Sequence, residues 1–244
     1  MTVSPNVYRR RLRICTEDRQ ARADLEDDNH RYGVIVTHDS ARVLSVNGLT
    51  LRIPWTLCHD AAAMLEKLEG TPIGTPFSKF YEHIDAGSQC THMADLAGLA
   101  IAWAGRRDFQ RQYDFEVRWT SDRQQQIATM DIDDSRFLEW TIENSHIVSP
   151  GRFAGEPLRK IKPVVEAFGD PELTEAVLLF RRAIFISNGK WLDLDSIQHP
   201  SETGHASGAC YVFQPDVAKR AIRIRGATRD FADKREQMLI DLTD

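Results

Sequence analysis

The segment from Gln89 to Ala104, QCTHMADLAGLAIAWA, is the strongest constraint on the fold of this chain. Small and apolar side chains occupy almost every position of it, so a helix formed here is apolar nearly all round. Such a helix is stable when other elements cover all of its sides. We therefore expect a buried central helix over about residues 91–105, with Cys90 and His92 at its N-terminal end.

Length and composition fit an ordinary globular protein around this helix. A chain of 244 residues, 42% hydrophobic and 27% charged, can bury a core without disulfide bonds. The net charge of −5 gives no reason to expect nucleic acid or an anionic membrane as a partner. No apolar run approaches the ~20 residues of a membrane span, and no signal-peptide core precedes Arg9. We expect a cytoplasmic protein with reduced cysteines, and the sequence leaves open whether it forms a homo-oligomer.

Alternating polar and apolar residues predict strands on both sides of the central helix. The predicted strands are 7–14, 21–26, 32–37, 42–53, 112–119, 124–132, 136–146 and 209–213, and the predicted helices are 57–68, 91–105, 158–168, 172–185 and 227–242. The fold class is therefore α+β: an antiparallel three-stranded meander followed by helices, with a second antiparallel β plus helix portion packed on it. We expect a site-bearing half at 1–108 and a second α+β half at 109–244, packed as one composite unit.

Four chemically active residues can converge at one edge of the first sheet. His30 follows the turn between two predicted strands, Cys58 lies in the first turn of a helix that Thr56 would cap, and Cys90 and His92 begin the central helix. Helix N-termini lower the pKa of a thiol and so favour the thiolate. Two histidines and two cysteines are ligands that zinc prefers, with iron as the alternative metal.

Other interpretations of these residues stay open. The cysteines also suit buried apolar positions, and His92 suits a helix cap or the core. In a version without metal, a cysteine acts as nucleophile or proton donor, a histidine as base and an aspartate as its orienting group. The remaining candidates are Asp27, Asp28 and Asp95 for proton transfer, and Arg52 with Arg10 of the 9–11 arginine run for a substrate anion. That run equally suits a solvated strand edge.

A second cluster lies late in the chain, in HPSETGHASGAC. It contains His199, His205 and Cys210, and the two glycines between them predict a flexible loop. Such a loop can form a lid or supply a ligand. It can also be a surface loop in which the histidines have no role.

Three motifs resemble a bacterial family designated domain of unknown function 2889. They are DDNHRYGV at 27–34, RIPWTLC at 52–58 and QCTHMADLAGLA at 89–100, and the resemblance continues loosely through RRA at 181–183 and through Cys210. Members of this family resemble accessory proteins of bacterial catabolic pathways for aromatic or acyl-CoA compounds. The resemblance therefore implies an enzyme that acts on a small organic acid.

The predicted order of elements is also similar to that of scaffold proteins of iron–sulfur cluster assembly. In those proteins cysteines, an aspartate and a histidine meet at one end of a sheet and bind zinc or a nascent cluster. The similarity implies metal binding by His30, Cys58, Cys90 and His92. This chain departs from the pattern because it lacks the cysteine of the first loop and continues through a whole C-terminal half.

These observations predict a metal-dependent lyase or hydrolase that acts on a small carboxylate-bearing or aromatic catabolic intermediate. Zinc or iron would be held by the four residues, as a Lewis acid or to activate water. The alternatives are a non-catalytic zinc or iron–sulfur handling scaffold and a metal-free Cys/His acid–base catalyst.

Overall fold

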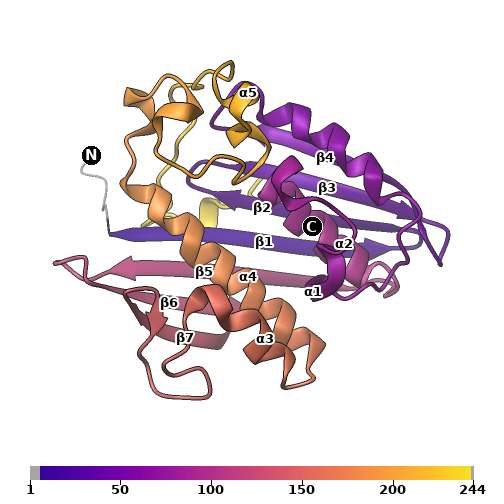
Figure 1. Cartoon of the computed structure of the whole chain (residues 1–244). Coiled ribbons are helices and arrows are strands. Elements are labelled where there is room, and N and C mark those ends of the chain that lie inside the picture. Colours follow the sequence, from indigo (N-terminus) through magenta and orange to yellow (C-terminus); the bar gives the residue numbers. More distant parts are fainter. Residues whose placement is uncertain (1–5, 243–244) are drawn as a thin grey trace.

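One antiparallel sheet of eight strands, in the order β4-β3-β2-β1-β5-β6-β7-β8, forms the frame of the molecule (Figure 1). The computed structural model describes residues 6–242, so residues 1–5 and 243–244 of the two predicted halves lie outside the described residues. The strands are β1 (Val7–Glu17), β2 (Gln20–Asp27), β3 (Arg31–His38), β4 (Val43–Arg52), β5 (Gln110–Trp119), β6 (Gln125–Ile132), β7 (Ser135–Glu143) and β8 (His146–Ile147). The predicted α+β class is confirmed, and the second group of strands extends the first sheet through pairing of β1 with β5.

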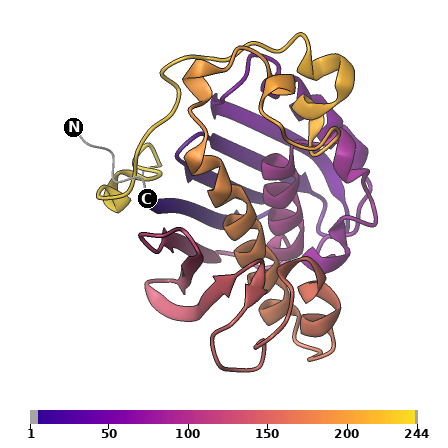
Figure 2. The same ribbon diagram turned by 60° about the vertical axis from the view of Figure 1, so that its left-hand side comes forward.

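The α-helices lie on one face of this sheet (Figure 2). The α-helices are α1 (Phe77–Phe80), α2 (Thr91–Trp103), α3 (Ile161–Glu166), α4 (Pro171–Ser187) and α5 (Pro215–Ala218). The 3₁₀ helices are η1 (Cys58–Leu68), η2 (Ala86–Ser88), η3 (Leu158–Lys160), η4 (Asn188–Trp191), η5 (Leu194–Ser196), η6 (Pro200–Glu202), η7 (Tyr211–Phe213) and η8 (Arg235–Gln237). Helix α2 packs on β2 and β3, whereas α4 packs on β5 and β1.

The apolar helix predicted at 91–105 is confirmed as α2, and it is buried on all sides. Its Gly98 allows the helix to approach α1 closely, because a Cβ there would lie 2.8 Å from Cγ of Phe80. Although α2 is apolar, its 13 residues are fewer than the ~20 that a membrane-spanning helix needs. Within residues 6–242, no helix is long and apolar enough to cross a membrane.

The two faces of the sheet differ sharply in polarity. In β1, Leu12 and Ile14 are fully buried under the helices, whereas Arg11 and Arg13 project from the other face. The C-terminal segment 229–242 lies against that second face, as the yellow chain in Figure 2 shows. Leu239 donates its backbone N–H to Glu26 Oε2 at 2.7 Å. The sheet is thus covered by apolar helices on one side and tied to the C-terminal segment by polar contacts on the other.

The two halves repeat one topology. Each has four antiparallel strands followed by helices on the same face, and the first strands of the halves, β1 and β5, are antiparallel neighbours. Such a pairing relates the halves by a local two-fold axis perpendicular to the sheet. No repeat is visible in the sequence.

Several local predictions are wrong, and in each case a tertiary contact explains why the structure differs. Strand β1 is central and not a solvated edge, because β2 and β5 pair with its two sides. Thr56 does not cap η1; its hydroxyl accepts the backbone N–H of Ile222 instead. Residues 209–213 do not form a strand: η7 covers Tyr211–Phe213, and Tyr211 donates its backbone N–H to the carbonyl of Gln89.

The charged helix predicted at 227–242 is absent except for η8. Some backbone amides of this segment bond outside it, since Arg229 donates to the carbonyl of Asp28 and Leu239 to Glu26. Others, such as those of Lys234 and Gln237, donate to carbonyls three residues earlier, as in isolated turns. Leu239 also has a φ of 58°, which an α-helix does not contain. Contacts with β2 and its following turn therefore outweigh the local helical preference.

Candidate functional site

The site is built around Asp27, the last residue of β2. Its Oδ1 accepts hydrogen bonds at 2.9 Å from the backbone amides of Asn29 and His30 and from the ring Nδ1 of His30. Its Oδ2 accepts from the Tyr8 hydroxyl at 2.9 Å and from Arg10 at 3.3 Å. The D-x-x-H spacing thus forms a tight turn in which the carboxylate orients the histidine ring.

Asp27 is ionised in this environment. Burial, the largest influence, raises its pKa, but His30, His92 and Arg10 together hold the pKa well below its usual range. An ionised carboxylate can only accept hydrogen bonds, so Nδ1 of His30 carries the proton between the two groups. The other ring nitrogen of His30, Nε2, is left free to act on a bound molecule.

His92, in the first turn of α2, lies against His30 with their ring centroids 3.9 Å apart. Its Nδ1 is 3.9 Å from Cys90 Sγ, and its Nε2 is 3.8 Å from Asp27 Oδ2, beyond hydrogen-bonding distance. That Nε2 is buried and has no hydrogen-bond partner within residues 6–242. Burial lowers the pKa of His92, and the positive charge that His30 carries when it is protonated and the charge of Arg10 lower it further, so this ring is neutral.

The thiols of Cys58 and Cys90 lie beside the hydroxyl of Tyr32, whose pKa is raised by burial and by these two neighbours. None of the four cysteines forms a disulfide bond. The predicted stabilisation of the thiolates is wrong, because burial raises the pKa of both thiols and outweighs the backbone amides that bond to them. Both cysteines are therefore protonated at neutral pH.

A pocket of about 250 Å³ opens beside these residues. It brings together the four residues predicted as metal ligands, namely His30, Cys58, Cys90 and His92. Among the described residues, however, the ligand atoms that lie within 4.8 Å of one another belong to Asp27, His30 and His92, and neither thiol is part of that group. The rest of the wall is mainly apolar and includes Trp55, Phe185, Ile186, Leu192, Leu194, Val212 and Phe213.

The predicted arginines and Asp28 lie outside the pocket wall. Arg10 is 1% exposed and lies behind Asp27. Arg52 donates to Glu26 and to the backbone carbonyl of Asp27. Asp28 is paired with Lys190 at 2.9 Å, and its burial raises its pKa to about 6. These groups hold the turn that carries His30 and do not face a ligand.

The cation that faces the pocket is Arg182 of α4, which sequence reasoning missed. Asp95 does not line the pocket, but its Oδ2 accepts from Arg182 Nε at 3.0 Å. Tyr32 was also missed, although it lies two residues after His30 in an extended strand. Since alternate residues of a strand share a face, that spacing could have indicated it.

The late loop contributes to the pocket as well. His205 and Cys210 line it, whereas His199 is turned away and bonds through Nδ1 to the carbonyl of Ala221 at 2.8 Å. The segment is held in place because Gln214 donates to the carbonyl of Gly87. The loop therefore forms one wall of the pocket.

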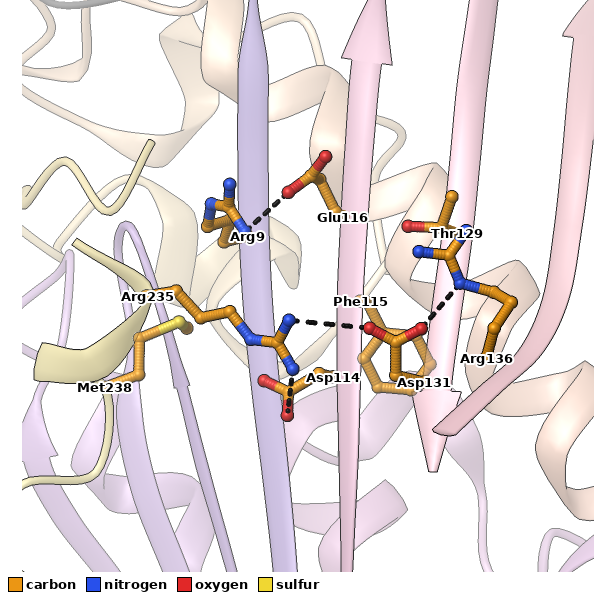
Figure 3. A pocket seen from close by; sticks show the side chains of 9 residues that line it. All are labelled: Arg9, Asp114, Phe115, Glu116, Thr129, Asp131, Arg136, Arg235 and Met238. Atoms are coloured by element: carbon orange, nitrogen blue, oxygen red, sulfur yellow. Dashed lines mark hydrogen bonds and ion pairs between the residues drawn. The ribbon is translucent and has the colours of Figure 1, made fainter. Parts of the chain in front are cut away.

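A smaller hollow of about 50 Å³ lies on the other face of the sheet (Figure 3). Its charged groups pair with one another: Arg9 with Glu116, and Arg235 with Asp114 and Asp131. Arg235 belongs to the C-terminal segment and the acids to β5 and β6, as Figure 3 shows. The ion pairs that line this hollow hold the C-terminal segment against the sheet.

Fold and site together define an α+β protein with a histidine–carboxylate pair at the wall of an apolar pocket. The family model described as Protein of unknown function (DUF2889) matches residues 14–104, and over this part the chain resembles that family, as its motifs predicted. The match includes Asp27, His30, Cys58, Cys90 and His92. No curated protein matches the chain.

Proposed function

We propose that this protein is an enzyme that transfers protons to and from a small organic substrate, with His30 as general base. The observation that carries the proposal is the bond between Asp27 Oδ1 and His30 Nδ1 at the wall of the pocket. Because Nδ1 is bound to the carboxylate, Nε2 is the nitrogen that can accept a proton from a substrate.

The geometry gives each residue a role. When His30 accepts the substrate proton on Nε2, the ring becomes positively charged next to the buried carboxylate of Asp27, which stabilises it. Two backbone amides fix Asp27, so the ring cannot turn away. A base positioned in this way contributes roughly 10²- to 10⁴-fold to the rate. His92 stays neutral and packs on the His30 ring, where a second positive charge would oppose the transfer.

The apolar wall supports a small aromatic or apolar organic acid as the substrate. A pocket of this kind also favours an enzyme over a non-catalytic zinc or iron–sulfur scaffold, which needs no room for an organic molecule. Lyase chemistry fits best: an oriented base takes a proton from the substrate, the electrons of that C–H bond form the new C=C bond, and the leaving group departs with the electrons of its own bond to carbon. Proton-transfer chemistry needs no nucleic-acid or membrane partner, and we keep the cytoplasm as the proposed compartment because none of the four cysteines forms a disulfide bond.

Solvent exchange tests the proposal without a known product. The protein is incubated in D₂O with a panel of arylacetic, arylpropionic and arylacrylic acids, and deuterium uptake is followed by mass spectrometry and NMR. We expect uptake or conversion for the wild type and a loss of at least about 100-fold for His30→Gln. His59→Gln is the matched control, because His59 is exposed and lies outside the pocket wall. Unchanged turnover in His30→Gln would refute the assignment.

The second candidate function is that of a metal-dependent enzyme. The ligand atoms of Asp27, His30 and His92 lie close together, and the unpartnered Nε2 of His92 could bind an ion, zinc or iron, which would supply a Lewis acid. It ranks second because the Asp27 oxygens already accept five hydrogen bonds, from Tyr8, Arg10, Asn29 and two groups of His30. Metal analysis of the purified protein decides between the two. A stoichiometric ion that is lost in His92→Ala supports the metal version.

A further inference from the structure

Arg182 has the geometry of an anion receptor. Its Nε donates to Asp95 Oδ2 at 3.0 Å, and one Nη donates to the Tyr81 hydroxyl at 3.3 Å. Tyr81 in turn donates to Asp95 Oδ1 at 2.5 Å. Asp95 is almost fully buried, whereas 27% of the Arg182 side chain is exposed, at the pocket wall. The guanidinium is therefore held from behind and presents its remaining N–H groups to the pocket.

The charge around Arg182 is not balanced by the protein. Arg181 is its neighbour in α4, and its Nε is buried with no hydrogen-bond partner in the described part of the chain. Within residues 6–242, Asp95 is the one carboxylate bonded to this pair, so two positive charges face one negative charge and the group has a net charge of +1. A partly buried positive charge of this kind is stabilised by an anionic ligand, and a guanidinium binds a carboxylate through two parallel hydrogen bonds.

The other residues of the pocket wall determine which kind of group a ligand can carry besides its anionic end. Trp55, Phe185 and Phe213 line the same pocket as Arg182 and His30. A flat apolar body fits against such side chains. One molecule can then be held by its anionic end at Arg182 and by its ring against the aromatic wall, and can present its reacting group to His30.

We infer that Arg182, oriented by Asp95 and Tyr81, is the specificity residue of the pocket and binds the carboxylate of a small aryl carboxylic acid. This inference rests on the proposed function, because it names the substrate class of the same pocket. It assigns Arg182 a binding role and leaves the proton transfer to His30.

Binding measurements test it with pairs of probes of equal shape. Cinnamate and phenylacetate are compared with cinnamamide and phenylacetamide by calorimetry, which needs no turnover. We expect the wild type to bind at least one carboxylate about 10- to 100-fold more tightly than its amide, as a charge-assisted pair implies. Arg182→Met should lose this preference and still bind the amide, while Arg107→Met, an exposed control that pairs with Asp18 on the surface, should keep it.

Two further variants keep the result interpretable. In Arg182→Met/Asp95→Asn both charges are removed together, so a loss of preference cannot come from an unpaired Asp95. In His30→Gln the preference should persist even though turnover is lost, which separates this inference from the proposed function. The inference is overturned if the wild type prefers no carboxylate over its amide, or if both Arg182 variants retain the wild-type preference.

Discussion

Glu175 of α4 gives the sharpest prediction about stability. It is 5% exposed, and both of its oxygens accept from Trp103 Nε1, at 3.1 and 3.0 Å. Oε1 also accepts from the Tyr113 hydroxyl at 2.5 Å. Burial raises the pKa of Glu175 to about 7, because these bonds and the charge of Arg111 offset only part of the cost of burying a carboxylate. Glu175→Gln replaces the acid with a neutral group of the same shape.

The sign and size of the effect follow from the two states of the chain. In the unfolded chain Glu175 has its ordinary pKa of 4.5, so the folded protein binds this proton more tightly. The resulting stabilisation is fully present below pH 4.5 and is lost as the pH rises through about 7. The difference between the two pKa values corresponds to about 3 kcal/mol. The Glu175→Gln variant has no such proton, so its stability should not fall over this range on account of residue 175.

Urea unfolding at several pH values between 4.5 and 8 measures this difference. The free energy of unfolding of the variant minus that of the wild type should rise by about 3 kcal/mol across the range. Asp28, whose pKa burial raises to about 6, contributes equally to both proteins and cancels. Glu172→Gln, half exposed on the same helix, is the control and should show no such rise. Parallel pH profiles for wild type and Glu175→Gln would refute the reasoning.

Three further predictions concern other parts of the chain. Iodoacetamide at pH 8 should label Cys58 and Cys90 much more slowly in the folded than in the urea-unfolded protein, because burial raises the pKa of both thiols; equal rates by mass spectrometry would contradict this. Gly98→Ala should lower the free energy of unfolding by about 1–3 kcal/mol, since the added Cβ meets the Phe80 ring, and an unchanged melting temperature would argue against that contact. Asp170→Ala should cost about 1 kcal/mol by removing the side-chain cap of α4, whereas Asp170→Asn should recover most of it in the same melting assay.

Much of the fold was predictable because its signals are local. The apolar run of α2 requires burial whatever surrounds it, and the alternation at 112–119 and 124–132 appears as β5 and β6. The start of α4 is also set locally, because Asp170 caps the helix and Pro171 is its first residue. In each case neighbouring residues alone set the backbone preference.

The approach of His30, Cys58, Cys90 and His92 to one pocket also followed from local reasoning. The order of strands and helices places their turns and helix starts at the same end of the first sheet. The protonation state of the two cysteines did not follow from local reasoning. The field of a helix N-terminus favours a thiolate, but how far burial opposes it depends on the segments that cover the cysteines, among them the wall at 209–213.

The sequence by itself determined the α+β class and the buried central helix, because each depends on residues close together in the chain. The meeting of histidines and cysteines at the N-terminal end of that helix followed from the order of the predicted strands and helices. The tertiary structure decided that β1 is central, that Asp27 holds His30 and that Arg182 faces the pocket. Arg182 meets Asp95 across 87 residues of chain, and such a pairing arises only when the sheet register brings α2 and α4 to the same face. The cysteine–histidine segment at the start of α2 therefore shares its pocket with the proposed base His30, which follows β2, and with the proposed anion receptor Arg182 of α4.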